Sequence, residues 1–237
     1  SEITQRFSTG VPQNLEQRFA SRAAHMKPSE IRSLFAVASR PEIVSLAGGM
    51  PNLSALPMGM MADVVNNLIR NNGQEALQYG NGQGHPKLRE QICEVMALEG
   101  IRANPDDVLI TTGSQQALDL ISRIFLDPHD VVLAEAPSYV GALGTFHQYE
   151  AAVVHVETDD NGLVPSALQE AIKTVRAAGR KIKFLYTIPN YQNPSGVLLP
   201  ASRRTEILNI CREAGIFVVE DNPYGLLGFD KPSPNAM

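Results

Sequence analysis

The sequence predicts an α/β fold built on a mainly parallel sheet. Short apolar runs recur along the chain from residue 107 to residue 220, and segments with helical spacing of apolar residues separate them. Apolar runs without alternation are typical of strands that are covered on both faces, which is how parallel sheets are built. The runs that we expect to form strands are 107–112, 130–135, 152–156, 182–188 and 215–220.

The segments between these runs predict helices. In the first of them, Leu118, Ile121 and Phe125 recur on one face of a 3.6-residue period. The helices expected between and after the strands are 114–127, 139–149, 165–179 and 200–214.

The last strand should be buried on both faces, yet it ends in Glu220 and Asp221, where burying a charge is costly.

The first hundred residues have a different pattern, with helical spacing and connections rich in Gly, Pro and Asn. We expect helices at 13–24, 29–38, 58–71 and 85–98. Residues 1–50 should form an N-terminal arm with part of a small domain. Residues 51–237 should form a large domain, which we expect to be incomplete at its C-terminal end because no closing helix follows the last strand. Met58, Met60 and Met61 are expected to pack in a core.

Composition excludes several classes of protein. The formal net charge is −5, which gives no electrostatic reason to expect nucleic acid or an anionic membrane as a partner. No apolar run approaches the roughly 18–20 residues of a membrane span. Cys93 and Cys211 show neither disulfide nor metal-ligand spacing. We therefore expect a cytoplasmic protein without a metal site.

Polar residues follow the predicted strands at the edge where α/β sheets bind ligands. Gly113 and Ser114 open a helix whose free N–H groups can bind phosphate, with Ser114 as the N-cap. Tyr139 follows the second strand and Asn193 the fourth. Taken singly, these residues also fit a helix cap, a rim tyrosine and a turn asparagine.

Asp221 and Tyr224 follow the fifth strand and complete the set. Together, the residues at the strand ends could bind a ligand that carries a phosphate, an aromatic ring, a phenolic oxygen and a cationic ring nitrogen. Pyridoxal 5′-phosphate has all four, and Asp221 would be the partner of its ring nitrogen. A dinucleotide site is a poorer match, because no strand precedes the glycines of "YGNGQG".

Six stretches carry a family resemblance: "VSLAGGMPN", "ALQYGNGQGHPKLRE", "LITTGSQQALDL", "EAPSYVGAL", "FLYTIPNYQNPSG" and "VVEDNPYG". In this order the chain resembles the fold-type-I, class I/II pyridoxal-phosphate aminotransferases. It is most similar to the 2-aminoadipate/kynurenine and branched-chain/aromatic group. The resemblance implies a large domain that is a three-layer α/β/α sandwich, and a C-terminal small domain that is absent from this chain.

The resemblance also implies roles for individual residues. Ser114 and Gln115 would bind the phosphate, and Tyr139 would stack on the pyridine ring. Asn193 and Tyr224 would bind the phenolic oxygen, with Asp221 on the ring nitrogen. Further roles are implied for Tyr79, which would reach the phosphate of the partner subunit in a homodimer, for Gly48 and Gly49, which would line the substrate carboxylate pocket, and for the helix from Arg22 to Arg32, which would select the substrate side chain.

One family feature is missing. The family holds its cofactor as a Schiff base on a lysine in a Ser-x-Ser-Lys-like loop, and no such motif occurs here. None of the six lysines has that context: Lys27, Lys87, Lys173, Lys181, Lys183 and Lys231. Lys231 is expected to be solvated, as are Arg203 and Arg204 at the start of a helix. Residues 1–237 alone should therefore not transaminate.

The function expected from the resemblance is transamination between an amino acid and a 2-oxo acid. The donor would be aliphatic, aromatic or 2-aminoadipate-like, and the expected acceptor is 2-oxoglutarate. Two alternatives stay open. One is a pyridoxal-phosphate-binding sensor domain of a transcription regulator, and the other is a lyase or decarboxylase on the same scaffold.

Overall fold

The computed structural model describes residues 18–26, 40, 42–44, 51 and 53–237. The chain divides into two compact units. The first comprises Ser1–Lys27, Gln115–Asn235 and Met237, and the second comprises Pro28–Ser114 and Ala236. The organisation into residues 1–50 and 51–237 expected from the sequence stays a prediction.

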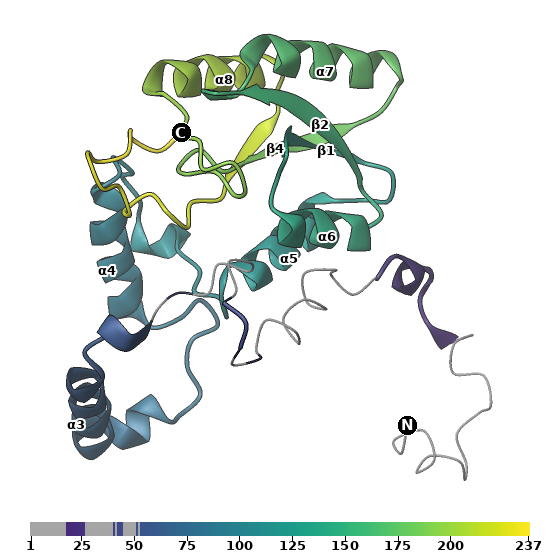
Figure 1. Cartoon of the computed structure of the whole chain (residues 1–237). Coiled ribbons are helices and arrows are strands. Elements are labelled where there is room, and N and C mark those ends of the chain that lie inside the picture. The colour runs from purple at the N-terminus through teal and green to yellow at the C-terminus, as the bar shows by residue number, and fades with distance from the viewer. Residues whose placement is uncertain (1–17, 27–39, 41, 45–50, 52) are drawn as a thin grey trace. The chain divides into compact units, whose positions relative to one another are not determined.

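The first unit is built on a five-stranded sheet with the order β3-β2-β1-β4-β5 (Figure 1). Strands β1, β2, β4 and β5 run parallel, and the short β3 pairs antiparallel with β2. The mainly parallel sheet predicted from the apolar runs is therefore confirmed. Its strands are β1 (Val131–Ala136), β2 (Ala152–Asp159), β3 (Gly162–Leu163), β4 (Ile182–Thr187) and β5 (Phe217–Glu220).

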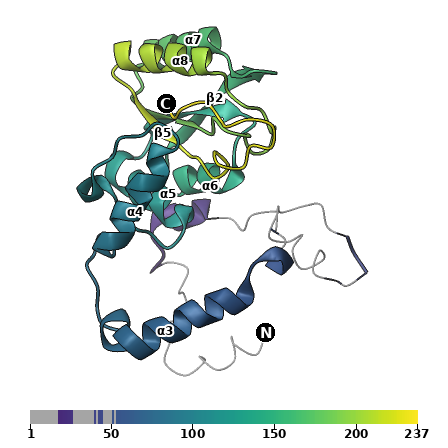
Figure 2. The ribbon, with the colours of Figure 1, turned by 90° about the vertical axis from the view of Figure 1, so that its left-hand side faces the viewer.

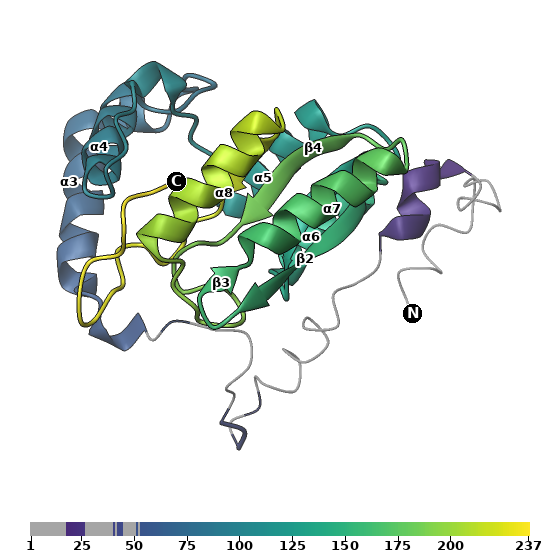
Figure 3. The same ribbon diagram turned by 90° about the horizontal axis from the view of Figure 1, so that it is seen from above.

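Helices cover both faces of this sheet. α5 (Ser114–Phe125) and α6 (Val140–Gln148) lie on one face. α7 (Pro165–Ala177) and α8 (Ala201–Glu213) lie side by side on the other (Figure 3). All four helices lie within the segments that the sequence predicts to be helical. The result is the three-layer arrangement expected from the resemblance.

Strand β4 is buried on both faces because a core lies on each side of it. Phe184 and Tyr186 point to the α5–α6 side, where Phe146 packs edge-on against both rings with centroid distances of 5.5 and 5.4 Å. Leu185 points to the α7–α8 side and packs in the cluster that contains Ile207. Alternation of side chains along a strand thus supplies both cores from one continuous apolar run.

The second unit contains η3 (Leu53–Ala55), α3 (Met58–Ala76), α4 (Pro86–Ala97) and η4 (Pro105–Asp107) (Figure 2). Arg89 of α4 is buried, and its guanidinium donates to the carbonyl oxygen of Pro105 at 2.8 Å, which ties α4 to η4. Across the described residues, no helix combines the length and the apolar character that crossing a membrane requires.

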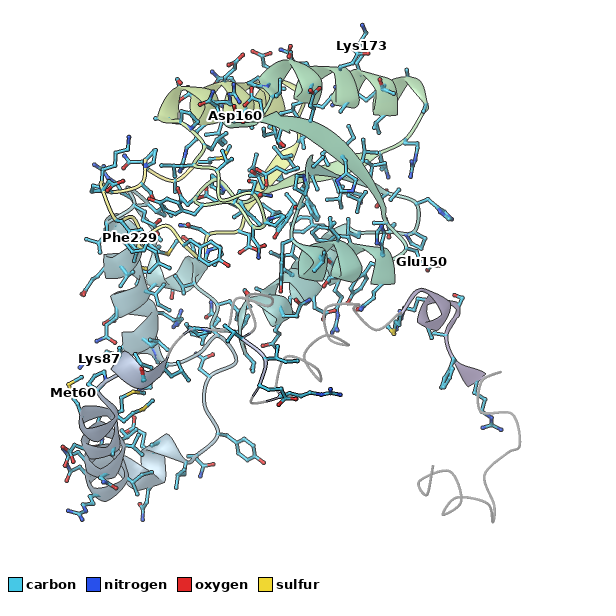
Figure 4. The ribbon with its side chains drawn as sticks, in the orientation of Figure 1. Met60, Lys87, Glu150, Asp160, Lys173 and Phe229 are labelled. Atoms are coloured by element: carbon cyan, nitrogen blue, oxygen red, sulfur yellow. The ribbon has the colours of Figure 1, made fainter. Side chains whose placement is uncertain are left out.

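The prediction that the methionines of α3 pack in a core is wrong for the described structure. Met58, Met60 and Met61 are each at least half exposed, and α3 has no buried residue. Figure 4 shows Met60 on this helix. The reason is that the apolar face of α3 meets no packing partner among the residues that the structure describes.

The strand expected at 107–112 is also absent from the described sheet. Residues Pro105–Asp107 form η4 instead, and Val108 closes that turn by donating to the carbonyl oxygen of Pro105 at 3.2 Å. The N–H of Ile110 donates to Gln83 in a loop at 2.8 Å. An apolar run becomes a strand only where a neighbouring strand completes its hydrogen bonds, and the described part of the chain supplies none here.

Strand β5 lies at the edge of the described sheet and is not buried on both faces as predicted. Phe217 is 68% exposed and contacts Phe125 with a ring-centroid distance of 5.8 Å. A groove of about 520 Å³ runs beside the strand, and its lining includes none of the predicted site residues. Its lining consists of Leu208, Cys211, Arg212, Gly215, Ile216, Phe217, Val218, Glu220 and Met237.

The two-sided core leads to a stability prediction. Replacing Phe146 with Ala should lower the free energy of unfolding by about 3–5 kcal/mol, because a fully buried ring that touches Phe184 and Tyr186 is lost and a cavity remains. His147→Ala, the exposed neighbour on the same helix, should change it by no more than about 0.5 kcal/mol. Urea unfolding measures both, and equal losses would contradict this account.

Candidate functional site

The carboxyl ends of three neighbouring strands meet at one edge of the first unit. β1, β4 and β5 are adjacent and parallel, so the segments that follow them emerge on the same side. Tyr139 follows β1, Asn193 follows β4, and Asp221 and Tyr224 follow β5. The structure thus brings together these four residues, as the sequence predicts.

Asp221 is held by its backbone and by its side chain. Its N–H donates to the carbonyl oxygen of Thr187 at 2.9 Å, which extends the β4–β5 pairing by one residue. Its carboxylate Oδ2 accepts a hydrogen bond of 2.6 Å from the hydroxyl of Tyr186. Burial and this hydrogen bond raise the pKa of Tyr186 far above its usual value, so the phenol stays a neutral donor.

Glu135 is a buried carboxylate at the end of β1 that the sequence analysis missed as a functional residue. It is 2% exposed and accepts hydrogen bonds from Thr187 Oγ1 at 2.8 Å and from the N–H of Ile188 at 3.0 Å. Burial raises the pKa of Glu135 to about 7, although these hydrogen bonds oppose the shift. Glu135 therefore joins the ends of β1 and β4.

Gln192 continues this connection into the loop that carries Asn193. Its amide nitrogen lies 3.5 Å from Glu135 Oε2 and donates to the carbonyl oxygen of Pro137 at 2.7 Å. Its amide oxygen accepts from the N–H of Ser195 at 2.8 Å and from the Ser195 hydroxyl at 2.6 Å. The residues on both sides of Asn193 are thereby fixed against the end of β1.

The prediction that Arg203 and Arg204 are both solvated is wrong for Arg204. Arg204 is 3% exposed, and its guanidinium donates to Asn190 Oδ1 at 2.6 Å and to backbone carbonyls of two segments, the one between β4 and α8 and the C-terminal one. Asn190 in turn donates to Asn222 Oδ1 at 2.8 Å, which ties the segment after β4 to the segment after β5. Arg203 pairs with Asp159 at 2.5 Å and is only partly exposed.

The N-terminus of α5 supplies backbone N–H groups. The helix begins at Ser114 itself, and not after Ser114 as a cap residue. Gly113 has a φ of 73°, a conformation that favours glycine, and a Cβ there would meet no atom within 4 Å. Gln115 is exposed, but its side-chain amide donates to Thr145 of α6 at 2.6 Å. Its contribution to anion binding would therefore come mainly from the backbone.

Other predicted residues are not placed at this edge. Tyr79 is 99% exposed and belongs, with Ser114, to the second unit. Arg22 is exposed in η2 (Ser21–His25). Gly48, Gly49 and Arg32 lie outside the described residues.

Lys27 lies outside the described residues, and Lys87 belongs to the second unit. Lys173 points outward from α7, and Lys87 lies on α4 (Figure 4). Lys183 forms an ion pair with Asp130 at 3.1 Å. Lys231 is exposed, as its turn sequence predicts.

The residues at this edge fit pyridoxal 5′-phosphate by their free hydrogen-bonding capacity. Half-buried polar side chains normally have partners, yet those of Asn193 and Tyr224 make no hydrogen bond within the described structure. Ser138, directly before Tyr139, has a buried hydroxyl that also makes none there. The ring of Tyr139 lies so close to Gly141 that a Cβ there would approach it within 2.5 Å.

Comparison with known proteins finds similarity to aminotransferases. The family model described as aminotransferase class I and II matches residues 42–237. Aromatic-amino-acid aminotransferase 1 of Thermococcus litoralis is 38% identical over 215 residues, which cover 90% of this chain and 52% of that protein. The 2-aminoadipate transaminase of Thermus thermophilus is 39% identical over 218 residues, which cover 92% of this chain and 52% of that protein.

A solved structure extends the similarity to the fold. The kynurenine aminotransferase of Pyrococcus horikoshii, solved in complex with PMP, aligns with a TM-score of 0.86 at 38% identity. The alignment covers 94% of this chain and 55% of that one. The fold class expected from the sequence is thereby confirmed. The chain spans about half the length of the curated relatives that it matches.

The buried carboxylate of Glu135 predicts a pH dependence of stability. Between about pH 4.5 and about pH 7, the folded state holds a proton on Glu135 that the unfolded state has lost. The free energy of unfolding should therefore fall across this window as pH rises, by about 3 kcal/mol in total. Glu135→Gln should remove this fall, because an amide does not titrate in this range. The variant should keep the local structure, since its amide oxygen can accept from Ile188 and its amide nitrogen can donate to Thr187 Oγ1.

Urea unfolding of both proteins at pH 5 and pH 8 checks this expectation. The stability of the wild type relative to Glu135→Gln should be lower at pH 8 than at pH 5. A difference that stays the same at both pH values would show that Glu135 does not titrate in this window.

Proposed function

The chain belongs to the class I and II aminotransferase family, and on this premise we propose that the complete protein transfers an amino group from an amino acid to a 2-oxo acid with pyridoxal 5′-phosphate as cofactor. The observation that carries the proposal is the carboxylate of Asp221 at the end of β5. It is anchored through Oδ2 by Tyr186. Asn193 and Tyr224 follow the neighbouring strands β4 and β5, and their half-buried side chains make no hydrogen bond within the described structure.

The cofactor, when bound, supplies a protonated ring that draws electrons away from the substrate's α-carbon. The residues of this chain would hold and tune that ring. Asp221 would keep the proton on the ring nitrogen, a charge-assisted contact that contributes roughly 1.5–3 kcal/mol. Asn193 and Tyr224 would donate to the phenolic oxygen. Tyr139 would pack on the ring, which adds roughly 0.5–1.5 kcal/mol beyond burial.

The phosphate would lie at the N-terminus of α5. The backbone N–H groups of Ser114 and Gln115 have no partner one turn earlier in the helix, and the helix dipole favours an anion there. The Gln115 side chain is already bonded to Thr145, so it would orient the start of the helix. Tyr79 of the partner subunit would add a donor to the same phosphate.

The substrate class rests on family resemblance and on the names of the relatives. Aromatic and 2-aminoadipate-like amino acids are the favoured donors, aliphatic ones remain candidates, and 2-oxoglutarate is the favoured acceptor. Gly48 and Gly49 would line the carboxylate pocket, and the segment from Arg22 to Arg32 would contact the donor's side chain. The sequence holds no lysine in the context that the family uses, so residues 1–237 alone should not transaminate.

A homodimer is part of the proposal, and the exposed face of α3 supports it. Met58, Met61, Val65 and Leu68 recur on one side of the helix and are 49–57% exposed. Polar side chains such as Asn67 occupy the opposite side. An apolar stripe of this kind indicates an interaction surface, and we infer that a second copy of the protein covers it.

An activity assay tests the proposed reaction. The complete protein, incubated with pyridoxal phosphate, 2-oxoglutarate and each candidate donor, should form glutamate and the keto acid of the donor. Cofactor binding without formation of a keto acid would instead indicate a pyridoxal-phosphate-binding sensor domain of a transcription regulator. Release of carbon dioxide or ammonia would indicate a decarboxylase or a lyase.

Asp221→Ala makes the assay specific for the site. The variant should lower kcat by about 100-fold or more and weaken cofactor binding by about 10-fold, because the ring nitrogen loses its charged partner. Asp160→Ala removes an exposed carboxylate from the turn after β2 and should leave both quantities unchanged (Figure 4). Unchanged turnover in Asp221→Ala would refute the role given to Asp221.

The dimer is tested on α3. Val65→Glu in the complete protein should shift the species seen by sedimentation from dimer to monomer, because a charge buried in an apolar interface is costly. Asn67→Glu, on the polar side of the same helix, should leave the dimer intact. A wild-type monomer, or a dimer that survives Val65→Glu, would contradict the interface.

A further inference from the structure

We propose that Tyr186 is a positioning residue for the cofactor: its hydroxyl holds Asp221 by one carboxylate oxygen and leaves the other, Oδ1, for the ring nitrogen. The inference rests on the proposed function. It gives a role to a core residue of β4 that is not among the predicted site residues. Tyr186 would act through Asp221 and would not touch the cofactor's nitrogen itself.

The place of the hydroxyl is set by the core. Tyr186 is fully buried on β4, and its ring packs edge-on against Phe146. In the β4–β5 register it pairs with Val219, two residues before Asp221. A ring packed in a close-packed core cannot swing away from its partner, so the donor stays 2.6 Å from Asp221 Oδ2.

The backbone around Asp221 is anchored independently of Tyr186. The N–H of Asp221 donates to the carbonyl oxygen of Thr187, and the side chain of Asn222 accepts from Asn190. Loss of the Tyr186 hydroxyl would therefore release the carboxylate without releasing the loop. Because the loop is held by other hydrogen bonds, the effect of the Tyr186 hydroxyl on the Asp221 carboxylate can be measured by itself.

Holding one oxygen has two consequences for the other. The carboxylate loses rotational freedom before the ligand arrives, so less entropy is lost when Oδ1 meets the ring nitrogen. The hydrogen bond on Oδ2 also draws electron density from the carboxylate and sets how strongly Oδ1 attracts the ring proton. Glu135 and Tyr139 are the other titratable groups near the phenol, and both disfavour its ionisation.

The experiment compares two ligands on the complete protein. One is pyridoxal phosphate and the other is its analogue in which a C–H group replaces the ring nitrogen, and absorbance titration gives both dissociation constants. Tyr186→Phe keeps the packed ring and removes only the hydroxyl. It should weaken binding of pyridoxal phosphate by about 10-fold, the effect of one charge-assisted hydrogen bond, and change binding of the analogue by less than about two-fold.

Tyr149→Phe is the matched control. The Tyr149 hydroxyl donates to Asp119 Oδ1 at 2.8 Å, so the control removes the same kind of phenol–carboxylate bond from another part of the first unit. It should change neither dissociation constant. Thermal melting of both variants records any general loss of stability.

The outcomes separate the inference from the function on which it rests. If Tyr186→Phe weakens both ligands equally, or neither, Tyr186 is structural and the inference is wrong while the function stands. If the wild type binds pyridoxal phosphate no more tightly than the analogue, Asp221 does not contact the ring nitrogen, and both proposals fall. A loss confined to pyridoxal phosphate supports the positioning role.

Discussion

A carboxylate buried at the edge of the sheet holds the ends of two central strands in place. Glu135 leaves β1 and accepts hydrogen bonds from Thr187 and Ile188 at the end of β4. Such a group is costly to bury, and its pKa rises accordingly. The hydrogen bonds that offset this cost require the two strands to end level with each other. The loops that follow can then present their side chains at a common edge.

From this junction, polar side chains extend across the whole edge. Gln192 ties the loop after β4 to the end of β1, and Asn190 ties it to Asn222 after β5. Tyr186 adds a bond from the core of β4 to Asp221. The loops that carry the side chains proposed to bind the cofactor are thus held in place by hydrogen bonds from other residues. Preorganisation of this kind is what a site that must hold a ring in one orientation requires.

Much of this arrangement follows from local pattern. The strands at 130–135 and 182–188 were predictable because their apolar runs supply two cores at once, and Asp221 because a charge after such a run is unusual. Local sequence pattern does not predict contacts between segments that are distant in sequence. The run at 107–112 forms no strand without a neighbour, and Arg204 is buried by loops distant in sequence. Tyr186 lies within the stretch "FLYTIPNYQNPSG", but its place beside Asp221 follows only from the pairing of β4 with β5.

The most direct measurement is a crystal structure of the complete protein with pyridoxal phosphate bound. We expect the ring at the carboxyl ends of β1, β4 and β5, with its nitrogen within hydrogen-bonding distance of Asp221 Oδ1 and with Tyr186 still bonded to Oδ2. A ring bound elsewhere, or a ring nitrogen that faces a group other than Asp221, would contradict it.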